Sequence, residues 1–87
     1  MARYMVIHHA PGVSVDDFRS NIPTVLEGKY ATFIKSYVNL TNGTIVNLYD
    51  AESEDAVARE LERVGFPYDE IQELQWEATA DDMRAMV

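Results

Sequence analysis

The feature that most limits how this chain can fold is a predicted β-hairpin at its centre. Side chains in residues 32–40 (TFIKSYVNL) fall into two alternating sets, as expected for a strand whose two faces meet different surroundings. The dipeptide Asn42-Gly43 follows, which is typical of tight hairpin turns, and residues 44–50 (TIVNLYD) form the predicted return strand. These two strands must therefore lie side by side and antiparallel, with the remaining elements arranged around them.

Each side of this hairpin carries one further helix and one further strand. Residues 3–9 (RYMVIHH) are rich in β-branched and aromatic side chains, which favours a strand that ends before the Pro-Gly pair that follows. Residues 71–77 (IQELQWE) predict the last strand, with Leu74 and Trp76 pointing inward.

The two predicted helices are marked by residues typical of helix ends. Ser14 followed by Asp17 resembles a capping box, and the helix that begins there carries an apolar stripe of Phe18, Ile22, Val25 and Leu26. Pro23 lies within that stripe and removes a backbone donor, so we expect a kink or two short helical pieces. Ser53 caps the second helix, and Gly65 is suited to the left-handed conformation that ends it.

The resulting order of elements predicts an α+β fold of the ferredoxin-like βαββαβ type. Right-handed crossovers place the four strands in one antiparallel sheet with both helices on one face. Residues 1–77 then form the domain, and residues 78–87 form a C-terminal tail in which Thr79 and Asp82 predict one short helical turn. A chain of 87 residues can bury one core, which excludes a second domain.

The sheet face that the helices leave uncovered predicts a homodimer. On that face we place four large side chains, namely Phe33, Tyr37, Ile45 and Tyr49. An apolar patch of this size is uncommon on a monomer. We therefore expect two copies to pair through their sheets and to enclose a cleft.

Composition and charge exclude several classes of protein. The chain has no cysteine, which excludes a disulfide scaffold, a thiolate zinc site and an iron–sulfur cluster. No stretch approaches the roughly 18 apolar residues of a membrane span, so we expect a cytoplasmic protein with no membrane partner. The net charge is −8, and residues 50–87 carry twelve acidic against three basic side chains, so we expect no nucleic-acid partner.

His8 and His9 are the candidate metal ligands. A neutral imidazole can bind nickel, zinc or copper, but neighbouring side chains on a strand point to opposite faces, so the pair cannot hold one ion together. At most one of them faces the open side, and the alternative is that both make ordinary hydrogen bonds at the strand end. A metal site would therefore need carboxylates, water or residues from a second copy.

A second candidate site combines polar side chains from several strands. Lys35 and Tyr37 share one face of their strand, and Asn47 and Tyr49 share one face of the next. If the hairpin places both sets on the uncovered face, they form with His8 a small polar pocket within an apolar rim, as expected for a ligand site. The alternative is interface packing in which the polar tips reach water. No residue is assigned a catalytic role.

Three stretches of the chain are similar to a known family. SYV (36–38), LYDAESEDAV (48–57) and GFPYDEI (65–71) resemble a family of small domains of unknown function whose relatives include nickel-binding, ferredoxin-like homodimers of the dimeric α/β-barrel type. The similarity covers residues 4–74. It implies the same fold, a homodimer, and a divalent transition metal such as nickel or a small ligand at the sheet face. The family commonly has a histidine where Lys35 stands, and a protonated lysine cannot replace it as a ligand.

Three functions remain open at this point. The first is a homodimeric binding protein that holds a divalent metal or a small ligand in the cleft on the open sheet face. The second is a dimeric α/β-barrel enzyme, such as an isomerase or a cofactor-independent monooxygenase, with His, Lys and Tyr side chains as acid–base groups. The third is an acidic interaction module whose C-terminal half binds a basic partner.

Overall fold

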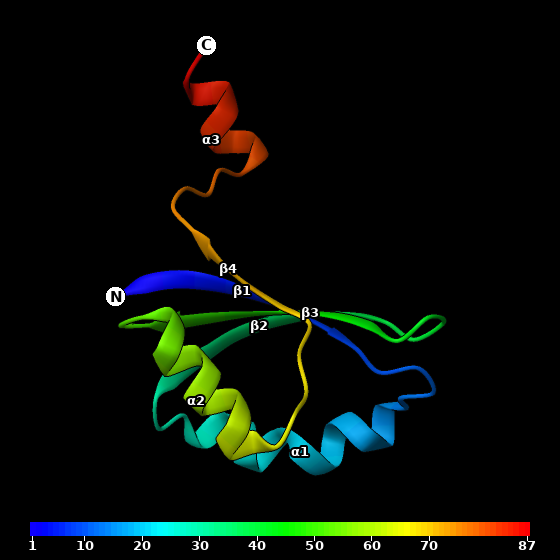
Figure 1. Cartoon of the computed structure of the whole chain (residues 1–87). Helices are drawn as coiled ribbons and strands as arrows, with labels where there is room; N and C mark the ends of the chain where they lie inside the picture. Colours follow the sequence, from blue (N-terminus) through cyan, green and yellow to red (C-terminus); the bar gives the residue numbers. More distant parts are fainter.

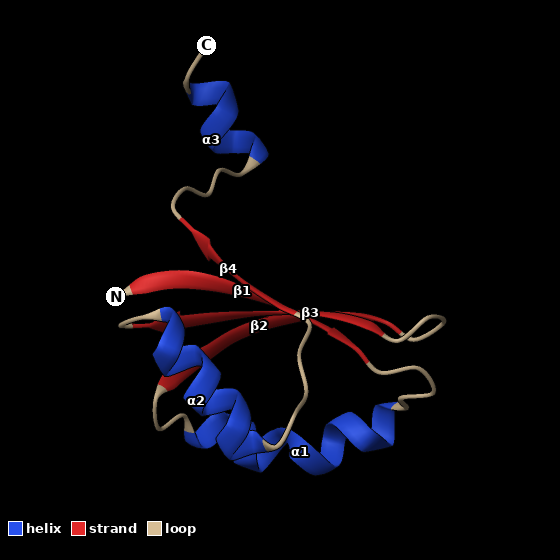
Figure 2. Cartoon of the chain, in the orientation of Figure 1, coloured by secondary structure: helices blue, strands red, loops and turns tan.

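The computed structural model describes residues 1–87 and confirms the predicted ferredoxin-like fold (Figure 1). Its elements are β1 (Ala2–His9), α1 (Val15–Glu27), β2 (Ala31–Asn39), β3 (Thr44–Ala51), α2 (Glu54–Val64), β4 (Glu70–Leu74) and α3 (Ala80–Ala85). The strands form one antiparallel sheet in the order β2-β3-β1-β4. Helices α1 and α2 lie on one side of the sheet, and α3 projects away from it on the other side (Figure 2). None of the helices has the length and apolar character needed to span a membrane.

The helix ends form where the local sequence predicts them. Ser14 Oγ accepts the Asp17 N–H at 3.2 Å, while the Ser14 N–H donates to the Asp17 carboxylate at 2.9 Å. Ser53 caps α2, and Gly65 ends it with a φ of 76°. Helix α1 continues through Pro23 as one helix, so the alternative of two separate pieces is wrong. Because Pro23 is exposed, its ring projects into solvent, and α1 loses one backbone hydrogen bond without being broken.

The hairpin between β2 and β3 turns at the predicted Asn-Gly pair. The side-chain oxygen of Asn39 accepts the N–H groups of Thr41 and Asn42 at 2.9 and 3.2 Å. Gly43 has a φ of 77°, and a Cβ added to it would lie 2.5 Å from the backbone of Ala10. Glycine is therefore required both for the turn and for the close approach of the loop that follows β1.

The core lies between the sheet and α2 and hardly includes α1. Its buried residues are Tyr4, Val6, Ala31, Tyr49, Ala51, Val57 and Leu61. Two of these come from α2, whereas α1 contributes no buried residue. Leu26, at the end of the apolar stripe of α1, is 66% exposed. The two helices thus cover the same sheet face in different ways.

A β-bulge in β2 changes which of its side chains face the helices. Phe33 pairs with Tyr49, but the next pair is Lys35 with Leu48, so Ile34 is an extra residue in β2. Tyr49 and Leu48 are neighbours on β3 and face opposite sides of the sheet. Phe33 therefore lies on the helix side, whereas Lys35 lies on the open side.

This register corrects the expected composition of the open face. Phe33, Ile45 and Tyr49 were placed there, but all three lie on the helix side, where Ile45 and Tyr49 are buried. The alternation of buried and partly exposed residues along β3 fixes this assignment. The apolar side chains that the open face does carry are Met5, Ile7, Tyr37, Val46, Leu48 and Leu74.

The predicted inward position is wrong for both Leu74 and Trp76. Leu74 pairs with Arg3 and lies on the open side, whereas the core-facing residue of β4 is Ile71, and Trp76 lies beyond the end of β4. The last residue of β4, Leu74, pairs with Arg3, and β1 itself begins at Ala2, so no strand remains for Trp76 to pair with. Trp76 is 66% exposed. The chain after β4 leaves the sheet and continues into α3, whose N-cap is Thr79.

A buried ion pair joins α2 to the C-terminal end of α1. Glu60 is fully buried, and its Oε1 accepts the N–H groups of Lys29 and Tyr30 at 3.1 and 2.9 Å. Arg63 pairs with the other carboxylate oxygen and also donates to the carbonyl of Thr24 in α1 at 2.8 Å. Burial by itself would raise the pKa of Glu60, but Arg63 and the two backbone N–H groups together hold it below its ordinary value of 4.5.

This lowered pKa predicts how stability depends on pH. The contribution of Glu60 is present above the unfolded pKa of about 4.5 and is lost as the pH falls through the lower folded value. We predict that Glu60→Gln lowers the free energy of unfolding by about 3 kcal/mol at about pH 7, because Arg63 then loses its buried charged partner and keeps only the exposed Glu27. At about pH 3 the difference from the wild type should be smaller. Urea denaturation followed by circular dichroism measures both values.

Glu62→Gln is the matched control for that measurement. Glu62 lies on the same helix but is exposed and makes no salt bridge, so its replacement should change the free energy of unfolding by less than about 0.5 kcal/mol. An equal difference between Glu60→Gln and the wild type at both pH values would contradict the prediction.

Candidate functional site

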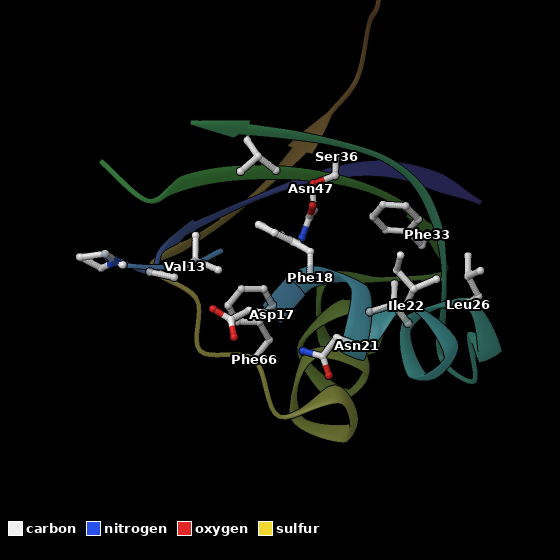
Figure 3. A pocket seen from close by; sticks show the side chains of 15 residues that line it. Val13, Asp17, Phe18, Asn21, Ile22, Leu26, Phe33, Ser36, Asn47 and Phe66 are labelled. Carbon is white, nitrogen blue, oxygen red and sulfur yellow. The ribbon is translucent and has the colours of Figure 1, made fainter. Parts of the chain in front are cut away.

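A groove lies between α1 and the part of the sheet formed by β2 and β3 (Figure 3). Its volume is about 620 Å³, which is within the range of small-molecule sites. Phe18, Ile22 and Leu26 of α1 line one wall, and Phe33 and Ser36 of β2 line the wall opposite. The apolar stripe of α1 therefore faces a groove and not the packed core.

The floor of this groove contains a polar residue held by a buried histidine. Nδ1 of His8 lies 2.7 Å from the carbonyl oxygen of Pro67, which can only accept, so Nδ1 carries the hydrogen. Nε2 is therefore the acceptor, and it receives a hydrogen bond from the side-chain amide nitrogen of Asn47 at 3.1 Å. These two bonds fix both the tautomer of His8 and the orientation of the Asn47 amide. Burial lowers the pKa of His8, which favours this neutral form.

The side-chain oxygen of Asn47 has no hydrogen-bond partner in the protein. Asn47 is 6% exposed and lines the groove, where Figure 3 places it beside Ser36 in the sheet. Because its Nδ2 is directed at His8 on β1, Oδ1 is directed away from β1. A buried acceptor left unpaired costs about 1–3 kcal/mol. Because this oxygen has almost no open surface, a group in the groove would reach it only after neighbouring side chains move.

Phe66 connects His8 to the groove. Its ring is stacked on the His8 ring, with centroids 4.3 Å apart and planes inclined by 20°. Phe66 also lines the groove, whereas His8 does not. His8 is therefore a positioning residue that orients Asn47 and supports Phe66 without itself facing the groove.

The structure divides the five predicted ligand residues between the two faces of the sheet. His8, Asn47 and Tyr49 are buried on the helix side. Lys35 and Tyr37 lie on the open side, with the Lys35 ammonium 4.9 Å from the centre of the Tyr37 ring. The single cleft predicted for them does not form, because the hairpin register pairs Lys35 with Leu48 and Tyr37 with Val46, which face away from Asn47 and Tyr49.

The same division separates the side chains proposed as acid–base groups. Burial, with a contribution from Glu60, raises the pKa of Tyr49 to about 12, so this phenol is uncharged at neutral pH. Lys35 lies across the sheet from both Tyr49 and His8. The histidine, lysine and tyrosine of the enzyme hypothesis are therefore not brought together within one chain.

The two histidines lie on opposite faces and do not form a metal site in one chain. Both ring nitrogens of His8 are engaged, by Pro67 and by Asn47. His9 lies at the open side and pairs through Nδ1 with Asp69. No group of three His, Cys, Asp or Glu side chains is placed to hold a metal ion. One chain therefore does not fit a nickel ion by itself.

Sequence reasoning missed the residues that form the groove walls. The sequence predicts Phe18, Ile22 and Leu26 only as an apolar helix stripe, and it includes Phe66 only in the stretch 65–71 that resembles the family. A usable signal was the floor itself, because Ser36 and Asn47 are polar residues on strands whose helix-facing positions are otherwise mostly apolar. Polar residues beneath an apolar helix stripe indicate a gap in the core.

The fold and the groove together define a small α+β domain with a ligand-sized site beneath one helix. The sequence pattern of the family described as nickel responsive protein SCO4226-like matches residues 4–74, so the chain belongs to that family. This confirms the resemblance predicted from the sequence. The crystal structure of SCO4226 from Streptomyces coelicolor A3(2) is similar, with a TM-score of 0.79 and 28% identity over 88% of this chain and 100% of that chain. No curated protein matches the chain.

Proposed function

We propose that this protein binds a small, mostly apolar molecule in the groove beneath α1. One observation carries this proposal, namely a groove of about 620 Å³ lined by the apolar stripe of α1. A helix in a small domain normally buries that stripe against the core, yet α1 has no buried residue. A bound molecule would cover the stripe and lie against Asn47, whose side-chain oxygen is unpaired.

Binding of an apolar fluorescent probe tests this proposal. We predict that N-phenyl-1-naphthylamine gains fluorescence on binding the wild type, because the groove removes it from water. Ser36→Trp should weaken binding by about tenfold or more, since an indole on the sheet floor would fill the groove. Arg59→Trp, which places the same side chain on the exposed face of α2, is the control and should bind the probe like the wild type. Equal binding by both variants would contradict a site in the groove.

We also propose that two copies pair through their open sheet faces. Met5, Ile7, Val46 and Leu48 are partly exposed there on adjacent strands, and Tyr37 extends the same surface. A surface of this kind, present identically on two copies, can form a symmetric interface in which each side covers the other.

Substitution at the centre of that face tests the dimer. We predict that the wild type sediments with the mass of two chains and that Leu48→Glu sediments as one, because the new carboxylates would be buried opposite each other. Ile22→Glu introduces the same side chain on the helix side and should leave the dimer intact. Sedimentation velocity distinguishes the two masses, and a wild type that remains a single chain at micromolar concentration would exclude this interface.

Nickel binding is the second candidate function, favoured by the family description and by the pair of His9 and Asp69 at the open side. One chain supplies two ligands, so we propose that a second copy supplies the others across the dimer.

In a calorimetric titration with nickel chloride, His9→Ala should lower the affinity by about tenfold or more. Asp16→Asn, a change at an exposed acidic residue of α1, should leave it unchanged. No heat from the wild type up to millimolar nickel would contradict this site.

A further inference from the structure

We infer that the groove prefers neutral apolar molecules that donate a hydrogen bond, such as phenols and alcohols, over molecules of similar shape that only accept one. This inference rests on the proposed function and deepens it by naming the chemical class of ligand. The observation behind it is the side-chain oxygen of Asn47, which is buried and lacks a partner, in a residue that lines the groove.

The Asn47 amide cannot present its nitrogen to the groove instead. A half-turn of the amide would place Oδ1 against Nε2 of His8, and both of these atoms are acceptors. His8 keeps its hydrogen on Nδ1 because of the Pro67 carbonyl at 2.7 Å, and its ring is held by stacking on Phe66. The unpaired group beneath the groove is therefore always an acceptor, and a bound molecule whose hydroxyl or N–H group reaches it would satisfy it.

The rest of the groove disfavours anions and does not select between donors and acceptors. Asp17 is the one charged side chain among the lining residues, and it is negative in a chain of net charge −8. A carboxylate in the groove would be repelled both by Asp17 and by the oxygen of Asn47. Ser36 and Asn21 can each donate or accept, so they serve either kind of molecule. The preference for a neutral donor therefore depends on Asn47.

Two compounds of similar shape test this preference. 2-Naphthol carries a hydroxyl donor, whereas 2-methoxynaphthalene is more apolar but can only accept. We expect 2-naphthol to displace N-phenyl-1-naphthylamine from the wild type at concentrations about tenfold lower, because the ether leaves the buried acceptor unpaired. In Asn47→Leu the difference should fall below about twofold, whereas Gln75→Leu, the same kind of change at an exposed amide outside the groove, should retain the ratio of the wild type.

Asn47→Leu leaves Nε2 of His8 without a donor and could fail to fold, so a second variant accompanies it. His8→Phe combined with Asn47→Leu replaces both polar partners by apolar side chains of similar size, a change that is often nearly neutral for stability. It should show the same loss of preference. Equal displacement by the two compounds in the wild type, or an unchanged ratio in either Asn47 variant, overturns the inference while leaving groove binding intact. If neither compound displaces the probe and Ser36→Trp binds it normally, both the inference and the proposed function fail.

Discussion

Helix α1 is held to the rest of the protein by polar contacts at its C-terminal end and not by a buried apolar face. Arg63 donates to the carbonyl of Thr24, and Glu60 accepts the N–H groups of Lys29 and Tyr30 where the chain leaves α1 for β2. Because Glu60 and Arg63 both belong to α2, they place the end of α1 beside α2 without drawing its middle onto the sheet. The groove is the consequence of this attachment, since the apolar stripe of α1 is oriented towards the sheet but does not reach a packed core.

The sheet beneath the helices is divided in the same way. Under α2, the sheet residues that pack with Val57 and Leu61 are mostly apolar, and their side chains are both large and small. Under α1, the sheet instead carries the polar residues Ser36 and Asn47. A buried amide next to a buried imidazole stabilises a fold less than two apolar side chains would, unless its hydrogen bonds are complete. Here the Asn47 side chain makes one hydrogen bond, from its nitrogen to His8, while its oxygen makes none. The unpaired oxygen belongs to a residue that lines the groove, so a bound donor is one way to satisfy it.

The elements could be predicted from the sequence because each is marked by a local signal. The capping box at Ser14 and the glycines at 43 and 65 act within a few residues, and all three are found where expected. The faces of the strands could not be predicted, because the hairpin pairs Tyr37 with Val46 and because Ile34 is an extra residue in β2. No local pattern marks either feature. A shift of one residue exchanges the two faces. The sequence therefore identifies Asn47 as a candidate ligand residue but predicts it on the wrong side of the sheet. The groove was not predicted.

The adjacent histidines restrict where a metal could bind if the groove also functions. A metal ion on His8 would have to displace the hydrogen bond from Asn47 to Nε2, which would free the amide to rotate and remove the fixed acceptor from the floor. A metal ion on His9 would leave these contacts unchanged, because His9 points to the opposite face and pairs with Asp69. Nickel binding and a preference for donor ligands are thus compatible when the metal lies on the open face. A metal that binds at His8 would abolish the preference instead.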